Sequence, residues 1–141
     1  MGGGAVLYAG HSAGGLAAVL AGAEDGDAIA VVGLDLTDSE GIGLGAAPAM
    51  DLPIYGIVGE PSSCNSSGNG VEVYRAAPLS LALQVTEADH CDVEDETDWL
   101  CTSFCAGENV RFSDASIQST IAGLATSALL DAAGLIDDLS P

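Results

Sequence analysis

One short stretch of the sequence has the residue types and the spacing of a serine nucleophile. Residues 8–16 read YAGHSAGGL and contain the pentapeptide Gly10-His-Ser-Ala-Gly14, a Gly-x-Ser-x-Gly pattern. Between a strand and a helix, this pattern places the serine on a strained turn, the nucleophile elbow. We expect a side chain at either flanking glycine to clash with the strand or the helix. Ser12 is therefore the candidate nucleophile, and the N–H of Ala13 is the candidate oxyanion donor.

The sequence around Ser12 supplies the elements that such a turn needs. The apolar run Ala5–Ala9 predicts a buried strand, and residues 13–22 predict a helix. Other glycine-rich signatures do not fit. A phosphate-binding P-loop needs Gly-Lys-Ser/Thr where this chain has Gly15-Leu16, and the dinucleotide pattern Gly-x-Gly-x-x-Gly is broken at His11.

A nucleophilic serine needs a base and an acid that orients the base, in the chain order Ser, Asp or Glu, His for this kind of turn. The chain has two histidines. His11 sits inside the turn and cannot fold back onto Ser12, so we expect it to be a packing residue. His90 follows the last predicted strand and is the candidate base, although a lone histidine in an acidic loop can also be simply solvated.

Several carboxylates compete for the role of the acid. Asp35 and Glu60 each follow a predicted strand directly, whereas Asp38 and Asp51 lie further into a loop. We favour Asp35 because it is the shorter side chain at a strand end, and Glu60 remains the alternative.

The rest of the chain predicts one α/β domain with an open, mostly parallel sheet and flanking helices. The apolar runs lack polar alternation, as in strands that are covered on both faces. The predicted strands are residues 5–9, 28–34, 53–59 and 79–86; the predicted helices are 13–22, 71–77, 98–105 and 113–135; and the predicted loops include 35–51, 60–70 and 87–96.

The composition is globular and strongly acidic. Hydrophobic residues make up 48% of the 141 residues, and two arginines with no lysine face 21 acidic residues, which gives a net charge of -19. The length suits a single domain over residues 1–141. Such a surface repels phosphate backbones and anionic headgroups, so we expect neither nucleic acid nor acidic membranes as partners. No charge-free run of 18 apolar residues predicts a membrane span, and the acidic run 92–96 lacks the glycine of a calcium loop.

The four cysteines predict disulfides and hence an oxidising compartment, secreted or periplasmic. A zinc site would need paired Cys-x-x-Cys units, which the chain lacks. Sequence alone allows three pairings. Proximity around His90 favours Cys91 with Cys101 or Cys105, which leaves the remaining cysteine for Cys64.

Four segments together resemble a known family. GHSAGG, VVGLDLTD, PIYGIVGEPSSCN and ADHCDVED look like the second half of a chlorophyllase-like α/β-hydrolase, with platelet-activating-factor acetylhydrolases and dienelactone-hydrolase-like polyesterases nearby. The likeness runs over roughly residues 5–110. It implies that Asp35, in its Gly-Leu-Asp context, is the acid and that His90 is the base.

The resemblance also implies an activity. It suggests a carboxylic ester hydrolase that works through an acyl-enzyme without a metal or organic cofactor, on a small-molecule, lipid-like or polyester substrate. A serine peptidase or amidase of the same fold, and an inactive remnant or binding module, are the alternatives.

The chain departs from that family at its beginning. Members of the family place three or four strands and a first oxyanion loop before the elbow, whereas here one predicted strand precedes Ser12. We therefore expect a partial α/β-hydrolase fold without the N-terminal strands, as in a C-terminal fragment or a truncated gene product. The isolated chain is then expected to hydrolyse esters slowly or not at all.

Overall fold

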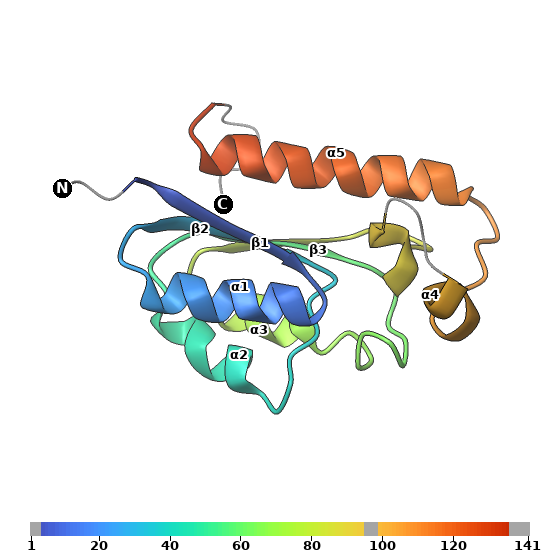
Figure 1. Ribbon diagram of the computed structural model, residues 1–141, viewed down its shortest axis with the longest axis horizontal. Helices are drawn as coiled ribbons and strands as arrows, with labels where there is room; N and C mark the ends of the chain where they lie inside the picture. Colours follow the sequence, from blue (N-terminus) through green and yellow to red (C-terminus); the bar gives the residue numbers. More distant parts are fainter. Residues whose placement is uncertain (1–3, 95–98, 136–141) are drawn as a thin grey trace.

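The chain has an α/β fold in which helices flank a four-stranded parallel sheet with the strand order β1-β2-β3-β4 (Figure 1). The computed structural model describes residues 4–94 and 99–135. The strands are β1 (Val6–His11), β2 (Ala28–Leu34), β3 (Ile54–Val58) and β4 (Ser80–Gln84); the helices are α1 (Ala13–Glu24), α2 (Ile42–Ala46), α3 (Gly70–Ala76), α4 (Trp99–Phe104) and α5 (Asp114–Ala132); and short 3-10 turns occupy Ala47–Ala49 and His90–Val93.

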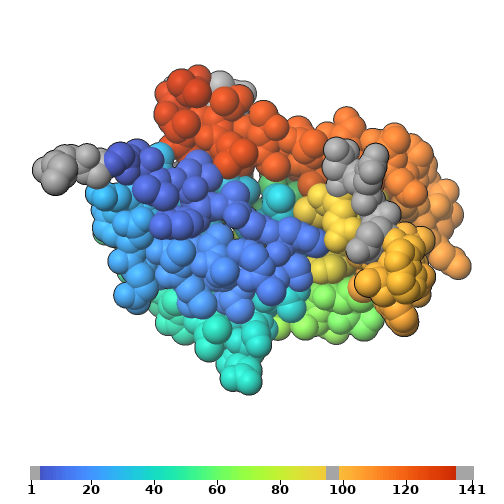
Figure 2. Space-filling view, in the orientation of Figure 1, coloured from blue at the N-terminus to red at the C-terminus, as the bar shows by residue number. Residues whose placement is uncertain are grey.

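Both faces of the sheet are covered, as the apolar strands predict. Successive side chains of a strand point to opposite faces, so neighbouring residues of β2 enter different cores. Val31 packs with Val19 of α1 and Tyr74 of α3 on one face, and Val32 packs with Ile121 of α5 on the other. Figure 2 shows α5 as a ridge along one side of the molecule, with β1 and α1 below it.

The predicted strands are confirmed, and their bounds differ little from the prediction. β2 has the predicted limits, and the other three strands begin and end within two residues of the predicted ones. The helices predicted over 13–22, 71–77 and 113–135 correspond to α1, α3 and α5, and the turn predicted over 98–105 is α4, apart from residue 98, which lies outside the described residues.

Residues 35–51 were predicted as loop throughout, and that prediction is wrong. The segment contains α2 and a 3-10 turn. The Asp38 carboxylate accepts hydrogen bonds from the N–H groups of Gly43 (2.8 Å) and Leu44 (3.0 Å), so it satisfies donors at the start of α2. These contacts give hydrogen-bond partners to N–H groups that have none within the helix, which favours a helix despite the glycines.

Two disulfides join the segments that follow β3 and β4 to α4 and to the residue after it. Cys91 pairs with Cys101, and Cys64 pairs with Cys105, which confirms the predicted arrangement and selects Cys101 as the partner of Cys91. The second bridge ties the loop after β3 to the segment after α4. Such bonds are compatible with an extracellular location. Within residues 4–94 and 99–135, no helix has both the length and the apolarity that crossing a bilayer requires.

Candidate active site

Ser12 occupies a strained turn between β1 and α1. Its backbone has φ 55° and ψ -122°, a region that residues other than glycine rarely adopt and that costs about 1–3 kcal/mol. The surrounding backbone holds this conformation. The Ser12 N–H donates to the Leu34 carbonyl at 3.0 Å, and the Ser12 carbonyl accepts from the N–H groups of Gly15 (3.0 Å) and Thr37 (3.3 Å). The hydroxyl is thereby fixed at the end of the strand.

The two flanking glycines have different roles. A Cβ on Gly10 would lie 2.2 Å from the Gly14 carbonyl oxygen, so the clash predicted at this position is confirmed. A Cβ on Gly14 would meet nothing within 4 Å, so the clash predicted there is wrong. The tight position on the helix side is Gly15, where a Cβ would lie 3.0 Å from the Gly10 carbonyl oxygen. The strand-to-helix turn therefore requires a residue without a side chain at Gly10, because the backbone at the start of α1 lies against it.

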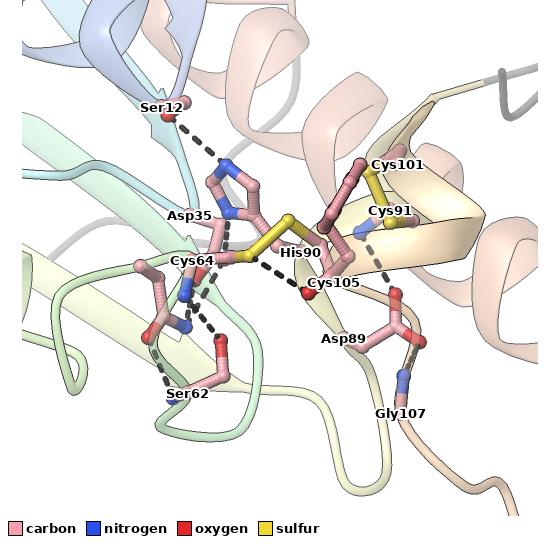
Figure 3. Close-up of a disulfide and its surroundings, with 12 residues drawn as sticks. Ser12, Asp35, Ser62, Cys64, Asp89, His90, Cys91, Cys101, Cys105 and Gly107 are labelled. Atoms are coloured by element: carbon pink, nitrogen blue, oxygen red, sulfur yellow. Dashed lines mark hydrogen bonds and ion pairs between the residues drawn. A yellow bond between two sulfur atoms is a disulfide. The ribbon is translucent and has the colours of Figure 1, made fainter. Parts of the chain in front are cut away.

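The structure brings Ser12, His90 and Asp35 into one hydrogen-bonded chain (Figure 3). The His90 Nε2 atom lies 3.0 Å from the Ser12 hydroxyl, and the His90 Nδ1 atom lies 2.6 Å from an Asp35 carboxylate oxygen. The three residues follow β1, β2 and β4, whose carboxyl ends meet at one edge because the strands are parallel. Residues that are 78 positions apart in the sequence thus come into contact.

The alternative acids lie elsewhere. Glu60 is exposed, and its carboxylate accepts from the Gln84 side chain at 3.0 Å and from the Glu87 N–H at 3.2 Å. Asp38 caps α2, and Asp51 is exposed. None of these carboxylates has a hydrogen bond to His90 among the described residues, so the geometry singles out Asp35 as the partner of the histidine.

The Asp35 carboxylate is buried, with 2% of the residue exposed, and it is held ionised by its hydrogen bonds. Burial alone would raise the pKa of this carboxyl group. The hydrogen bonds from His90, from the Gly59 N–H at 3.0 Å and from Asn65 outweigh that effect and hold the pKa of Asp35 below its ordinary value. The negative charge of Asp35 is therefore favoured beside the His90 ring.

Asn65 is a site residue that the sequence analysis missed. It is fully buried, and its amide nitrogen lies 3.2 Å from each Asp35 carboxylate oxygen and 2.9 Å from the Glu60 carbonyl oxygen. Its amide oxygen accepts from the N–H groups of Ser62 and Gly68. The Asn65 side chain therefore holds the loop 60–70 together and also holds the Asp35 carboxylate in place. The only sequence feature that could have indicated this role is the presence of an asparagine in the loop after β3, the strand next to the one that precedes Asp35.

The loop that carries His90 is held from several sides. Asp89 precedes it and accepts hydrogen bonds from the N–H groups of Cys91 (2.8 Å) and Gly107 (2.5 Å), while Asp92 accepts from the Asp89 N–H (2.8 Å). Asp89 also accepts from the Asp92 N–H (3.2 Å), and the reciprocal bonds between these two residues form a capping box at the start of the turn. The Cys91–Cys101 bridge joins the residue after His90 to α4 (Figure 3). The position of the histidine is thus set by covalent and hydrogen-bonded supports.

Removing each disulfide is expected to lower the free energy of unfolding by an amount that grows with the logarithm of the length of the loop that it closes. The Cys64–Cys105 bridge spans 41 residues and the Cys91–Cys101 bridge spans 10. In the chain-entropy relation, these loops correspond to roughly 4 and 3 kcal/mol respectively. Urea unfolding of the Cys64→Ala/Cys105→Ala and Cys91→Ala/Cys101→Ala double variants measures the difference. Four free thiols in the native, unreduced protein, or a larger cost for the shorter loop, would contradict the expectation.

Ala13 begins α1, so its N–H is one of the donors that have no partner within the helix. The partial positive charge of the helix N-terminus lies at the same place. Among the described residues, no group of three or more His, Cys, Asp or Glu side chains is arranged to hold a metal ion.

Two hollows lie away from Ser12. One of about 260 Å³ lies between the end of β4 and α5, and one of about 330 Å³ lies beside the Cys64–Cys105 bridge. Neither hollow is lined by Ser12 or His90. The candidate nucleophile therefore lies outside both of them.

No protein-family model, curated protein or solved structure matches this chain. The features of the chain that indicate a function are the hydrogen-bonded arrangement of Ser12, Asp35 and His90 and the strained turn that carries the serine.

Proposed function

We propose that this chain is a serine hydrolase of the α/β-hydrolase type that cleaves carboxylic esters through an acyl-enzyme. The observation that carries the proposal is the hydrogen-bonded chain from the Ser12 hydroxyl through His90 to buried Asp35, with Ser12 on a strained strand-to-helix turn. This set of groups, in the chain order Ser, Asp, His, is one that carries out nucleophilic acyl transfer from a strand-to-helix turn of this kind.

The geometry supports a role for each group. The Ser12 hydroxyl attacks the ester carbonyl while the His90 Nε2 atom takes its proton. Asp35 accepts from the His90 Nδ1–H, which keeps Nε2 free to act as a base, and it stabilises the imidazolium that forms. The Ala13 N–H donates to the oxyanion. His90 then protonates the departing alcohol and activates the water that releases the acid.

These steps use no metal or organic cofactor. The resemblance described above favours a small-molecule, lipid-like or polyester ester as the substrate, and the two disulfides favour a secreted or periplasmic location. Because the same three groups also cleave amides, a p-nitrophenyl ester should be compared with the matching p-nitroanilide. Faster cleavage of the anilide would mean that the chain is a peptidase or an amidase and not an esterase.

A fluorophosphonate probe is expected to attach covalently to Ser12. The reagent forms one covalent bond with the nucleophile, so its attachment can be detected without turnover. The labelled position should be read by peptide mass spectrometry on the oxidised, folded chain. Ser12→Ala should abolish the label, and Ser63→Ala, a change in an exposed loop serine, should leave it in place. Label at Ser62 or Ser63, or no label at any serine, would contradict the proposal.

A further inference from the structure

The second histidine lies against the first. His11 is the last residue of β1 and pairs with Leu34 of β2, so its backbone is fixed by the sheet. Its ring centroid lies 4.5 Å from that of His90, and the two ring planes are inclined by 41°. This separation is within the range in which aromatic rings make favourable contact. His90 therefore has Ser12 and Asp35 at its two nitrogens and His11 against its ring.

The surroundings of His11 keep its ring uncharged. Its Nε2 atom is buried and has no hydrogen-bond partner among the described residues. A protonated imidazole carries an N–H on both nitrogens, and leaving a buried charged donor unpaired is costly. A proton on Nε2 is therefore disfavoured at this position.

The charged groups that face His11 are His90, Asp35 and Glu94. Burial lowers the pKa of His11 below its ordinary value, and the charge of His90 lowers it further. The carboxylates of Asp35 and Glu94 and a hydrogen bond with the His90 backbone act in the opposite direction without reversing the shift. The net shift favours the neutral form of His11 beside the His90 ring, whose centroid is 4.5 Å away.

We propose that His11 is a positioning residue whose flat, neutral ring holds the His90 imidazole in the orientation that faces both Ser12 and Asp35. The inference rests on the proposed function, because it assigns His11 a part in the proton transfer that His90 performs. It predicts that the ring face, and not merely the volume of the side chain, matters to the reaction. It also predicts that the hydrogen bond between the His11 ring and the His90 backbone contributes less to the reaction than the ring face does.

His11→Phe and His11→Leu form a matched pair, because both fill the site with apolar bulk but only phenylalanine offers a flat ring. We expect His11→Phe to retain at least a third of the wild-type kcat. We expect His11→Leu to lower kcat by roughly 10- to 100-fold, as for a misplaced catalytic group, with KM changed by less than about twofold. The acid limb of the pH–rate profile should stay in place in His11→Phe, since a neutral His11 contributes no charge.

A second measurement does not depend on turnover. The proton in the short His90–Asp35 hydrogen bond should give a far-downfield NMR signal in the wild type and in His11→Phe, and this signal should broaden or disappear in His11→Leu. Equal behaviour of the two variants in this signal, or a shifted acid limb in His11→Phe, would overturn the role of the ring. Failure of Ser12 to react with the fluorophosphonate, with the NMR difference intact, would overturn the proposed function and leave the positioning of His90 standing.

Discussion

Replacing His90 by alanine is expected to lower ester turnover to the rate of the Ser12→Ala variant, a loss of roughly 10⁶-fold in a complete triad enzyme. Ser12→Ala should have an effect of the same size, and the Ser12→Ala/His90→Ala double variant should be no worse than either single variant. The reason is that the two side chains act as one unit. In the proposed mechanism, the His90 Nε2 atom, which lies 3.0 Å from the Ser12 hydroxyl, removes the serine proton. Initial rates on a short p-nitrophenyl ester measure all three variants.

The control for this prediction is a change that leaves the three side chains and their supports in place. Ser63 is an exposed serine, so Ser63→Ala should keep the wild-type rate. Losses in the single variants that multiply in the double variant would mean that Ser12 and His90 act independently. The hydrogen bond between them would then have no part in catalysis.

The residues of the site could be predicted because they lie at strand ends. Ser12, Asp35 and His90 each follow an apolar run, and parallel strands bring their carboxyl ends to one edge. The strands could be placed because the hydrophobic pattern that predicts each of them lies within one short segment of the sequence. The order of serine, acid and base along the chain then follows from the order of these strands.

What the sequence did not reveal depends on contacts between distant segments. The role of Asn65 comes from the fold of a polar loop over Asp35, 30 residues away, and no local pattern encodes it. The contact between His11 and His90 likewise needs two strand ends to meet. α2 was missed because its glycines favour a loop, whereas in the structure the Asp38 carboxylate accepts from the N–H groups of Gly43 and Leu44 at the start of the helix.

The partner of Cys91 also could not be predicted from the sequence, although the candidate cysteines lie close to it along the chain. Cys101 and Cys105 lie one helical turn apart on and after α4, so either could be near Cys91 by sequence distance. The direction of α4 decides between them. Cys101 faces the His90 turn, and Cys105 faces the loop of Cys64.

Asp35→Asn is expected to lower kcat by about 10⁴-fold while the site keeps its shape. An amide at this position can donate to the His90 Nδ1 atom, which favours the tautomer that carries its proton on Nε2. That nitrogen can then no longer accept the proton of Ser12. The loss of the carboxylate also removes the negative charge that stabilises the imidazolium in a buried position. The value of kcat on a p-nitrophenyl ester, together with unfolding in urea to confirm that the variant is folded, measures the effect.

Glu60→Gln is the matched comparison, because it makes the same chemical change in the carboxylate that follows the next strand. Glu60 is exposed and bonded to Gln84 and Glu87 rather than to His90. Its replacement should therefore lower kcat by no more than a few-fold, and the glutamine can still accept from the Glu87 N–H. A large loss of kcat in Glu60→Gln with a mild loss in Asp35→Asn would mean that Glu60, after β3, is the acid. It would also mean that His90 leaves Asp35, 2.6 Å away in this structure, when the substrate binds.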